Sequence, residues 1–258
     1  MSEPRTIIEV VRRSSDRLWA VVDDLDDAAI AGPSYCSEWS VAQVLSHLGS
    51  GAEIFSLFLE AAASGREPPG REAFPPIWDS WNAKSPGAQA TDAERADRAL
   101  VERLEGLDDG QLAALRVAMF GMDLDIAALV RMRLFEHTMH SWDVAVTRDL
   151  GAELAPDAVD LLVDAIGAAV PRLAKPLDHE LRVRVRTSGP ERDLLLVVGS
   201  AVSLTDTGSD GAADAELDIP SAALLRLVYG RLDPEHTPEA TSARRVDLDT
   251  LRRVFPGF

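Results

Sequence analysis

The spacing of apolar residues changes once along this chain of 258 residues, and that change most limits the folds open to it. Over roughly the first 150 residues, apolar side chains recur at helical spacing. From His179 to Thr187 the chain instead alternates Leu181, Val183 and Val185 with arginines. A period of two is typical of a half-buried strand. The sequence therefore predicts a helical domain followed by a smaller domain that contains strands.

Local signals predict where the helices of the first domain begin. Ser40 followed by Gln43 has the pattern of a capping box, and so has Thr91 followed by Glu94. The strongest helical pattern runs from about Asp123 to Arg148. We expect helices at all three places.

The second domain is expected to mix short helices and strands. Its predicted elements are a helix opened by Pro156, strands over 179–187, 194–198, 201–204 and 215–219, a turn from Thr207, a helix capped by Ser221, and a last helix around Leu251. The fold class is thus mainly α with a smaller α+β part, divided into domains 1–152 and 153–258.

Charge and composition exclude several classes of function. The net charge is −17, and nucleic acids and anionic membranes both need clustered basic residues, so neither is an expected partner. Cys36 is the single cysteine, which rules out an intrachain disulfide. The first residues lack the pattern of a signal peptide, and no apolar stretch approaches the ~20 residues of a membrane span. We therefore expect a cytoplasmic protein.

Glu136 and His140 form the strongest candidate for a metal site. They lie four residues apart on a predicted helix, so both point to one face, and Asp143 extends that face. His47, in the middle of another predicted helix and followed by small residues, is the best third ligand. Two histidines and a glutamate with an open fourth position are typical of catalytic zinc. The same residues could equally be a solvated helix face and a satisfied core histidine.

Two stretches of the chain resemble one family. They are YCSEWSVAQVLSHL, from Tyr35, and RLFEHTMHSWDVA, from Arg133. Both are similar to signatures of the mycothiol-dependent maleylpyruvate isomerase family, and the C-terminal alternating strands with LLRLVYGR are similar to its sterol-carrier-like domain. The resemblance implies a DinB-like four-helix bundle followed by a sterol-carrier-like α+β domain.

The resemblance also implies a set of functional residues. His47, Glu136 and His140 would hold a divalent metal, with zinc preferred, and Asp143 matches an aspartate near that metal. Arg231, in the YGR sequence, matches a basic residue that can face the cleft. The cosubstrate would be mycothiol, a thiol of actinobacteria. Arg71, in the loop from Gly65 to Pro76, is the best candidate for binding an anion.

Three functions remain open at this stage. The first is an isomerase or S-transferase that adds a thiolate to a small electrophile. The second is a metal-dependent hydrolase. The third is a non-enzymatic binder of an apolar ligand. The protein is expected to be a monomer or a homodimer. We assign Trp39, Trp78, Trp81 and Trp142 to the core.

Overall fold

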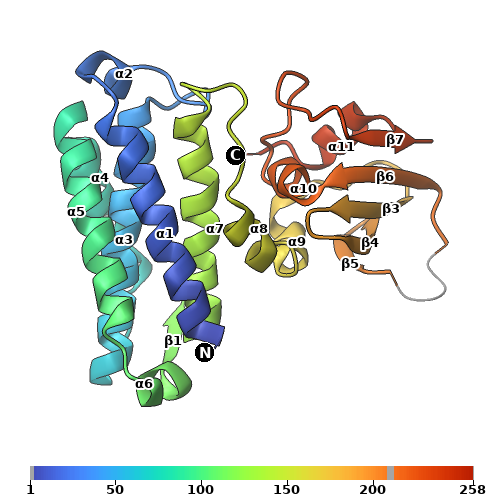
Figure 1. The fold of residues 1–258 in the computed structure, drawn as a ribbon. Helices are drawn as coiled ribbons and strands as arrows, with labels where there is room; N and C mark the ends of the chain where they lie inside the picture. Colours follow the sequence, from blue (N-terminus) through green and yellow to red (C-terminus); the bar gives the residue numbers. More distant parts are fainter. Residues whose placement is uncertain (1–2, 208–211, 258) are drawn as a thin grey trace. The chain divides into compact units, whose positions relative to one another are not determined.

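The chain folds into two compact units, residues 1–152 and 153–258, which Figure 1 shows as a helical part and a part with a sheet. They belong to a computed structural model that describes residues 3–207 and 212–257. The predicted fold class, mainly α with a smaller α+β part, is confirmed. Most of the turn predicted from Thr207 lies outside the described residues.

Four helices of 20 to 24 residues form the bundle of the first unit: α1 (Glu3–Asp23), α3 (Val41–Ser64), α5 (Pro86–Glu105) and α7 (Ile126–Ala145). α3 packs against α5 and α7, and α1 packs against the same two helices, so the four surround one core. In Figure 1, α1 and α7 run in one direction and α3 and α5 in the other. The residues at helical spacing fill this core; the largest include Trp19, Leu45, Leu48, Leu100 and Trp142.

Short elements connect the bundle helices. They are α2 (Asp27–Ala31), the 3-10 turn η1 (Arg71–Ala73), α4 (Phe74–Asn82), α6 (Asp109–Ala114), β1 (Arg116–Met119) and β2 (Met122–Asp125). β1 and β2 form an antiparallel hairpin just before α7. This hairpin was not predicted. Part of β2 falls on residues that the sequence pattern assigned to the helix from about Asp123 to Arg148.

The capping boxes predicted at Ser40 and at Thr91 differ in outcome. The capping box at Ser40 is confirmed, because Ser40 accepts from the backbone of Gln43 and the Gln43 side chain accepts from the backbone of Ser40. The capping box at Thr91 is wrong, since α5 already begins at Pro86 and Thr91 lies inside it. Proline at the first position of a helix loses no hydrogen bond, because the first amides of a helix have no partner within it.

The predicted start of α7, in contrast, lies too early in the sequence. Asp123 lies in β2, and Asp125 is the residue that caps the helix by accepting from the backbone of Ala128. Aspartate is a good capping residue, so Asp123 and Asp125 give the same local signal for the start of a helix.

The second unit is built on a five-stranded sheet in the order β5-β4-β3-β6-β7. Its strands are β3 (Leu181–Ser188), β4 (Arg192–Val198), β5 (Val202–Asp206), β6 (Ala215–Pro220) and β7 (Ser242–Arg244). β3 pairs in parallel with β6, and the other neighbouring strands are antiparallel. The four strands predicted in this unit are confirmed, with ends shifted by one or two residues.

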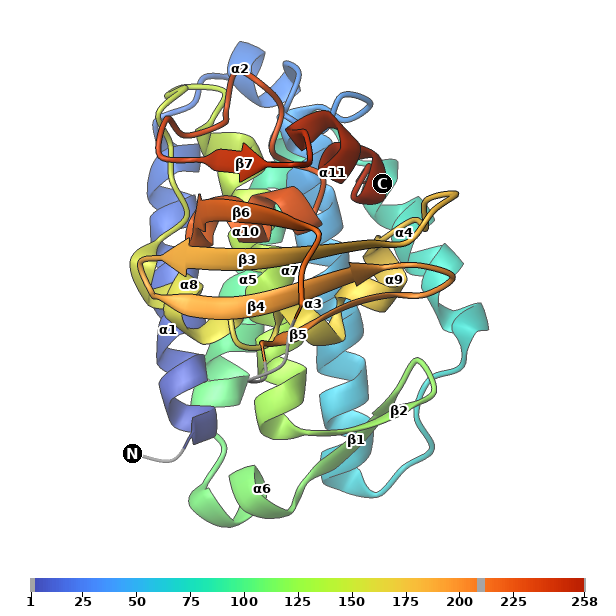
Figure 2. The same ribbon diagram turned by 90° about the vertical axis from the view of Figure 1, so that its right-hand side faces the viewer.

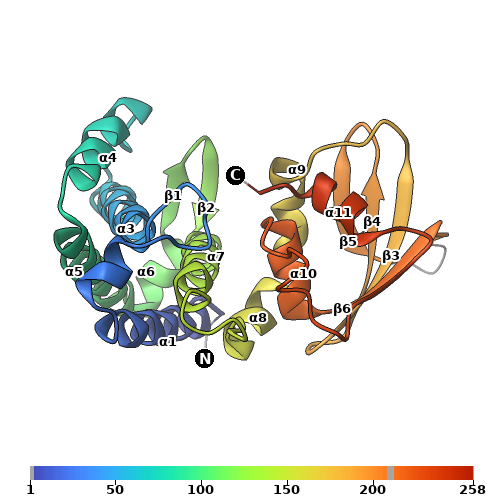
Figure 3. The same ribbon diagram turned by 90° about the horizontal axis from the view of Figure 1, so that it is seen from above.

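The two faces of this sheet differ in chemistry. The remaining elements are α8 (Pro156–Leu162), η2 (Ile166–Ala168), α9 (Val170–Leu173), α10 (Ser221–Val228) and α11 (Leu248–Val254). Figures 2 and 3 show α8, α9 and α10 on one face of the sheet. On the opposite face, Arg184 pairs with Asp193, and Arg186 pairs with Glu216 and Asp218. Two of the three arginines that alternate along β3, Arg184 and Arg186, therefore form ion pairs across neighbouring strands, whereas Arg182 donates to the carbonyl of Ala212.

Two predictions in the second unit are corrected. The helix opened by Pro156 ends at Leu162 rather than near Val170, and shorter turns follow it. Ser221 is the first residue of α10 rather than its cap, and its hydroxyl donates to the carbonyl of Pro190. Among the described residues, no helix is both long and apolar enough to span a bilayer.

Candidate metal centre

α3 carries His47 two turns after its capping box, with a side chain that is 38% exposed. The two glycines that follow let neighbouring helices come close. A Cβ on Gly49 would lie 2.4 Å from the ring of Trp81, and one on Gly51 would lie 3.3 Å from Nη1 of Arg133 in α7. Glycine is unfavourable within a helix, so the close approach of α3 to its neighbours explains these two residues.

α7 places Glu136 and His140 one turn apart on the face toward His47. His47 Nε2 lies 3.0 Å from Glu136 Oε2, which lies 3.7 Å from His140 Nε2. Potential ligand atoms of the three side chains all lie within 4.8 Å of one another. Tetrahedral zinc with bonds of about 2.0 Å needs ligand atoms about 3.3 Å apart. The three side chains therefore fit a divalent cation.

Asp143 lies behind His140 and is fully buried. Its Oδ2 is 2.8 Å from His140 Nδ1. An imidazole that donates Nδ1–H to a carboxylate keeps its Nε2 lone pair for a metal. Cys36 donates its thiol to the same oxygen at 3.1 Å, so the half-buried cysteine also belongs to this cluster.

The charges in the cluster favour the forms that bind a metal. Burial acts to raise the pKa of Glu136, but the hydrogen bond from His47 and the positive charge of His140 lower it to about 2. Burial lowers the pKa of His140, and its hydrogen bond to Asp143 opposes that shift only in part. Near neutral pH the glutamate is therefore ionised and His140 is neutral.

Trp39 lies over the two imidazoles. Its ring centroid is 5.3 Å from that of His47 and 6.2 Å from that of His140. The residue is 38% exposed, so its assignment to the core is wrong. The same correction applies to Trp78, which is 44% exposed, whereas the assignment holds for Trp81 and Trp142.

Neither of the two arginines predicted for the site belongs to α3 or α7, the helices that carry the candidate metal ligands. Arg71, in η1, lines a pocket together with Phe58 of α3. Phe58 comes eleven residues after His47, which is about 16 Å along a helix. Arg231 belongs to the second unit, where its Nη1 donates to the carbonyl of Tyr229 at 2.8 Å. Its role in catalysis stays a prediction.

A buried charge network beside the cluster was not predicted. Asp97 of α5 is fully buried and accepts hydrogen bonds from Arg133, Ser15 and Trp19. His137 Nε2 lies 3.3 Å from the same carboxylate. The sequence did contain a signal, because Asp97 stands at helical spacing among apolar residues of α5 and so had to face the core.

Comparisons with known proteins bear on the family and on the fold of this chain. Residues 11–145 match the family model "Mycothiol maleylpyruvate isomerase N-terminal domain". This span contains the side chains that we call the metal cluster: Cys36, His47, Glu136, His140 and Asp143. Two solved structures are similar in fold: a mycothiol-dependent maleylpyruvate isomerase, at 14% identity and a TM-score of 0.69, and its H52A mutant, at 13% and 0.70. Each alignment covers 94% of this chain and 93% of the other. Among proteins of curated function, a sequence search finds no match.

Proposed function

Because the chain belongs to the mycothiol maleylpyruvate isomerase N-terminal domain family, we propose that it is a metal-dependent enzyme with mycothiol as its thiol cosubstrate. The convergence of His47, Glu136 and His140 within 4.8 Å is the observation that carries the proposal. The reaction is an isomerisation or an S-transfer on a small electrophile.

The donor set supports a divalent metal, and zinc is our first choice among the metals that bind two imidazoles and a carboxylate. Such an ion supplies positive charge that deprotonates a bound thiol, whose pKa in free cysteine is about 8.5. The protein's own contribution is to hold the three side chains on two packed helices. Asp143 acts as a positioning residue, because its Oδ2 already receives hydrogen bonds from His140 and Cys36.

The thiolate of mycothiol would account for both the isomerisation and the S-transfer. In an isomerase, its sulfur adds to one carbon of a cis double bond, the adduct turns about the resulting single bond, and the sulfur leaves to give the trans product. In an S-transferase the new carbon–sulfur bond remains. A substrate carboxylate would need a positive partner, and Arg231 remains our proposal for it.

Metal stoichiometry by elemental mass spectrometry tests the proposal. We expect about one divalent ion per chain in the wild type and a loss of that ion in His47→Ala and His140→Ala. His179→Ala is the matched control, because His179 is an exposed histidine beside Asp178 in the second unit. A folded wild-type protein that neither contains metal nor takes up added zinc would refute the proposal.

Turnover assays then separate this function from its alternatives. We expect the metal-loaded protein to convert maleylpyruvate, or another electrophile with an activated double bond, only when mycothiol is present. Turnover that is equally fast without a thiol would favour the hydrolase, in which water is the nucleophile. Lipid that copurifies with metal-free protein would favour the binder of an apolar ligand.

A further inference from the structure

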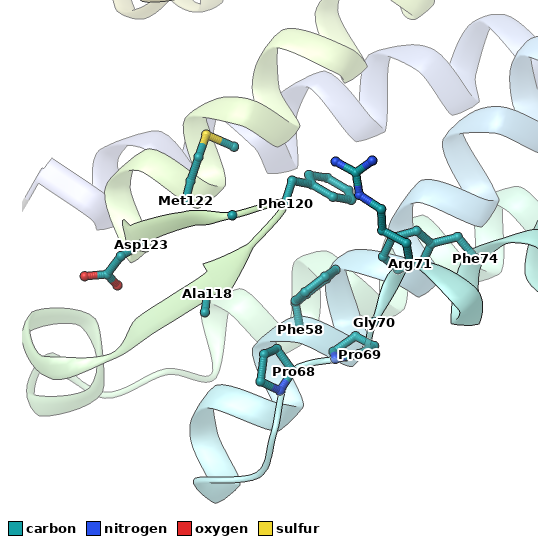
Figure 4. Close-up of a pocket in the computed structure, with 11 residues that line it drawn as sticks. Phe58, Pro68, Pro69, Gly70, Arg71, Phe74, Ala118, Phe120, Met122 and Asp123 are labelled. Carbon is teal, nitrogen blue, oxygen red and sulfur yellow. The ribbon is translucent and has the colours of Figure 1, made fainter.

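The pocket that Arg71 lines lies in the helical unit, away from His47, Glu136 and His140. It has a volume of about 520 Å³ and lies between the end of α3, the loop before α4 and the β1–β2 hairpin. Ligand pockets commonly measure about 300–1,000 Å³ and are mostly apolar with a few polar groups. Figure 4 shows that its walls come from the end of α3 with the loop that follows it, and from the hairpin, which is distant from both in the sequence.

Three aromatic rings form the wall of this pocket. The centroids of Phe58, Phe74 and Phe120 lie 5.6 to 5.9 Å from one another, at the tilted and edge-on angles that aromatic pairs prefer. Phe58 and Phe74 are buried, whereas Phe120 is 46% exposed. The exposed ring leaves an aromatic surface available to a further flat molecule.

The backbone at Phe120 is in an unfavourable conformation for this residue type. Its φ is +51° and that of Gly121 is +80°, so both central residues of the hairpin turn have positive φ. Turns of this kind favour Asn followed by Gly, and a bulky residue with positive φ is uncommon. A phenylalanine that costs stability in an exposed turn is most simply explained by what its ring contacts.

The charged groups of the pocket favour an anion. Among the residues that the structure describes, the guanidinium of Arg71 has no hydrogen bond or ion pair. Figure 4 shows Arg71 and Phe120 extending toward each other, while Asp123 points away from the rings. Asp123 pairs with Arg116 through both carboxylate oxygens, at 3.2 and 3.0 Å. Its charge is therefore compensated, and that of Arg71 is not.

From these observations, we propose that this pocket binds a small aromatic carboxylate at a site separate from the metal cluster. The ring of the ligand packs against Phe120 and the neighbouring phenylalanines. Its carboxylate binds the guanidinium of Arg71, whose planar donors match a carboxylate in shape. The phenylalanine rings and Arg71 thus contribute in different ways, the rings through apolar contact and Arg71 through its charge.

Calorimetric titration of the full chain with 1-naphthoate tests the proposal, with 1-naphthamide as a neutral ligand of the same shape. We expect saturable binding of one naphthoate per chain and about tenfold weaker binding of the amide, since a hydrogen bond to a charged group is worth about that factor. Arg71→Gln should bind naphthoate and naphthamide with the same affinity. Arg66→Gln is the matched control, because Arg66 is bonded to Ser64 and Glu60 and does not line the pocket.

A second variant tests the aromatic wall. Phe120→Asn removes the ring but suits the positive φ, so we expect naphthoate to bind at least about fivefold more weakly while the unfolding midpoint stays the same or rises. His47→Ala should bind naphthoate as the wild type does, which keeps this proposal independent of the metal site. The proposal is overturned if naphthoate does not saturate, if Phe120→Asn binds it unchanged, or if His47→Ala abolishes binding.

Discussion

Asp143 Oδ2 joins two side chains of the metal cluster, His140 and Cys36. It accepts a hydrogen bond from Nδ1 of His140, a proposed ligand, so its charge affects both the orientation and the basicity of that imidazole. The cysteine approaches the same oxygen from a loop before α3. We therefore expect the two partners of Asp143 to differ in importance.

The Asp143→Asn variant should lower zinc affinity by about 10- to 100-fold, because an amide is a weaker acceptor for His140 than a carboxylate. Competition with a chelator of known affinity measures the change. The control is Cys36→Ser, which keeps a donor to Asp143 and should bind zinc within about threefold of the wild type. Equal losses in the two variants would contradict the positioning role of Asp143.

Asp97 gives a prediction about stability and pH. Burial acts to raise its pKa, but His137 and Arg133 hold that pKa well below its usual range. A carboxyl whose pKa is lower in the folded state stabilises the fold above its unfolded pKa, near 3.9, and that contribution is lost as the pH falls. The Asp97→Asn variant lacks this contribution, and the buried Arg133 loses its charged partner. We therefore expect the unfolding free energy to fall by about 3 kcal/mol at pH 7.

Urea unfolding of both proteins from pH 7 downward measures this effect. The difference in unfolding free energy should be largest near pH 7 and should shrink below about pH 4. The metal ligands are the same in both proteins, so their own titration cancels in the difference. If the difference in unfolding free energy stayed constant between pH 7 and pH 3, the lowered pKa of Asp97 would be contradicted.

Single residues of the site were predictable to different degrees. Glu136 and His140 follow from helical spacing, and His47 was chosen as their partner because small residues follow it in another predicted helix. The resemblance to a family then supported all three residues. Trp39 could not be placed, because aromatic residues usually enter the core and only the loop that carries it determines where its ring lies. Asp97 carried a readable signal in its helical spacing, whereas its bonds to α1 depend on how three helices meet.

At the scale of elements, the packing of α3 depends on two glycines whose surroundings differ. At Gly49 a Cβ would lie 2.4 Å from the Trp81 ring and 2.9 Å from Ala93 Cα, so backbone would have to move. At Gly51 it would meet only a side-chain nitrogen of Arg133 at 3.3 Å. Alanine also favours a helix over glycine by about 1 kcal/mol, which offsets a mild contact.

We therefore expect Gly49→Ala to cost about 1–3 kcal/mol of unfolding free energy, and Gly51→Ala to remain within about 1 kcal/mol of the wild type. Urea unfolding of the two variants at pH 7 gives both values. Each variant serves as the control for the other, since they add the same methyl group two residues apart. If Gly51→Ala lost more than about 1 kcal/mol of unfolding free energy, the side chain of Arg133 could not shift to make room.

Element boundaries show why local patterns were insufficient. The β1–β2 hairpin has strands of four residues and a turn of Phe-Gly, where Asn-Gly would have been a clear signal. The helix predicted from Thr91 begins earlier because Ser85 and Pro86 supply a start that the capping-box pattern does not describe. Long periodic segments were predicted reliably, and short elements between them were not.

At the scale of the whole molecule, the charge of −17 acts on any charged substrate. A carboxylate substrate approaches a protein of like charge, and salt screens that repulsion because the Debye length falls from about 30 Å at 10 mM to about 8 Å at 150 mM. For an anionic electrophile we expect kcat/KM to rise with added salt over this range.

A series of rates at increasing sodium chloride concentration checks this expectation. A neutral electrophile is the control, and its kcat/KM should change little. If kcat/KM for the anion instead falls with salt, the field at the site is locally positive and dominates over the net charge of the chain.

The indole of Trp39 has one more consequence. A ring within 6.2 Å of both imidazoles absorbs and emits light at the very place where an ion would bind, and the charge state of a neighbouring imidazole alters indole emission. Among the five tryptophans, Trp39 has ring contacts with both of those histidines. Trp39 is therefore a built-in fluorophore from which metal binding at the proposed site can be followed without any label.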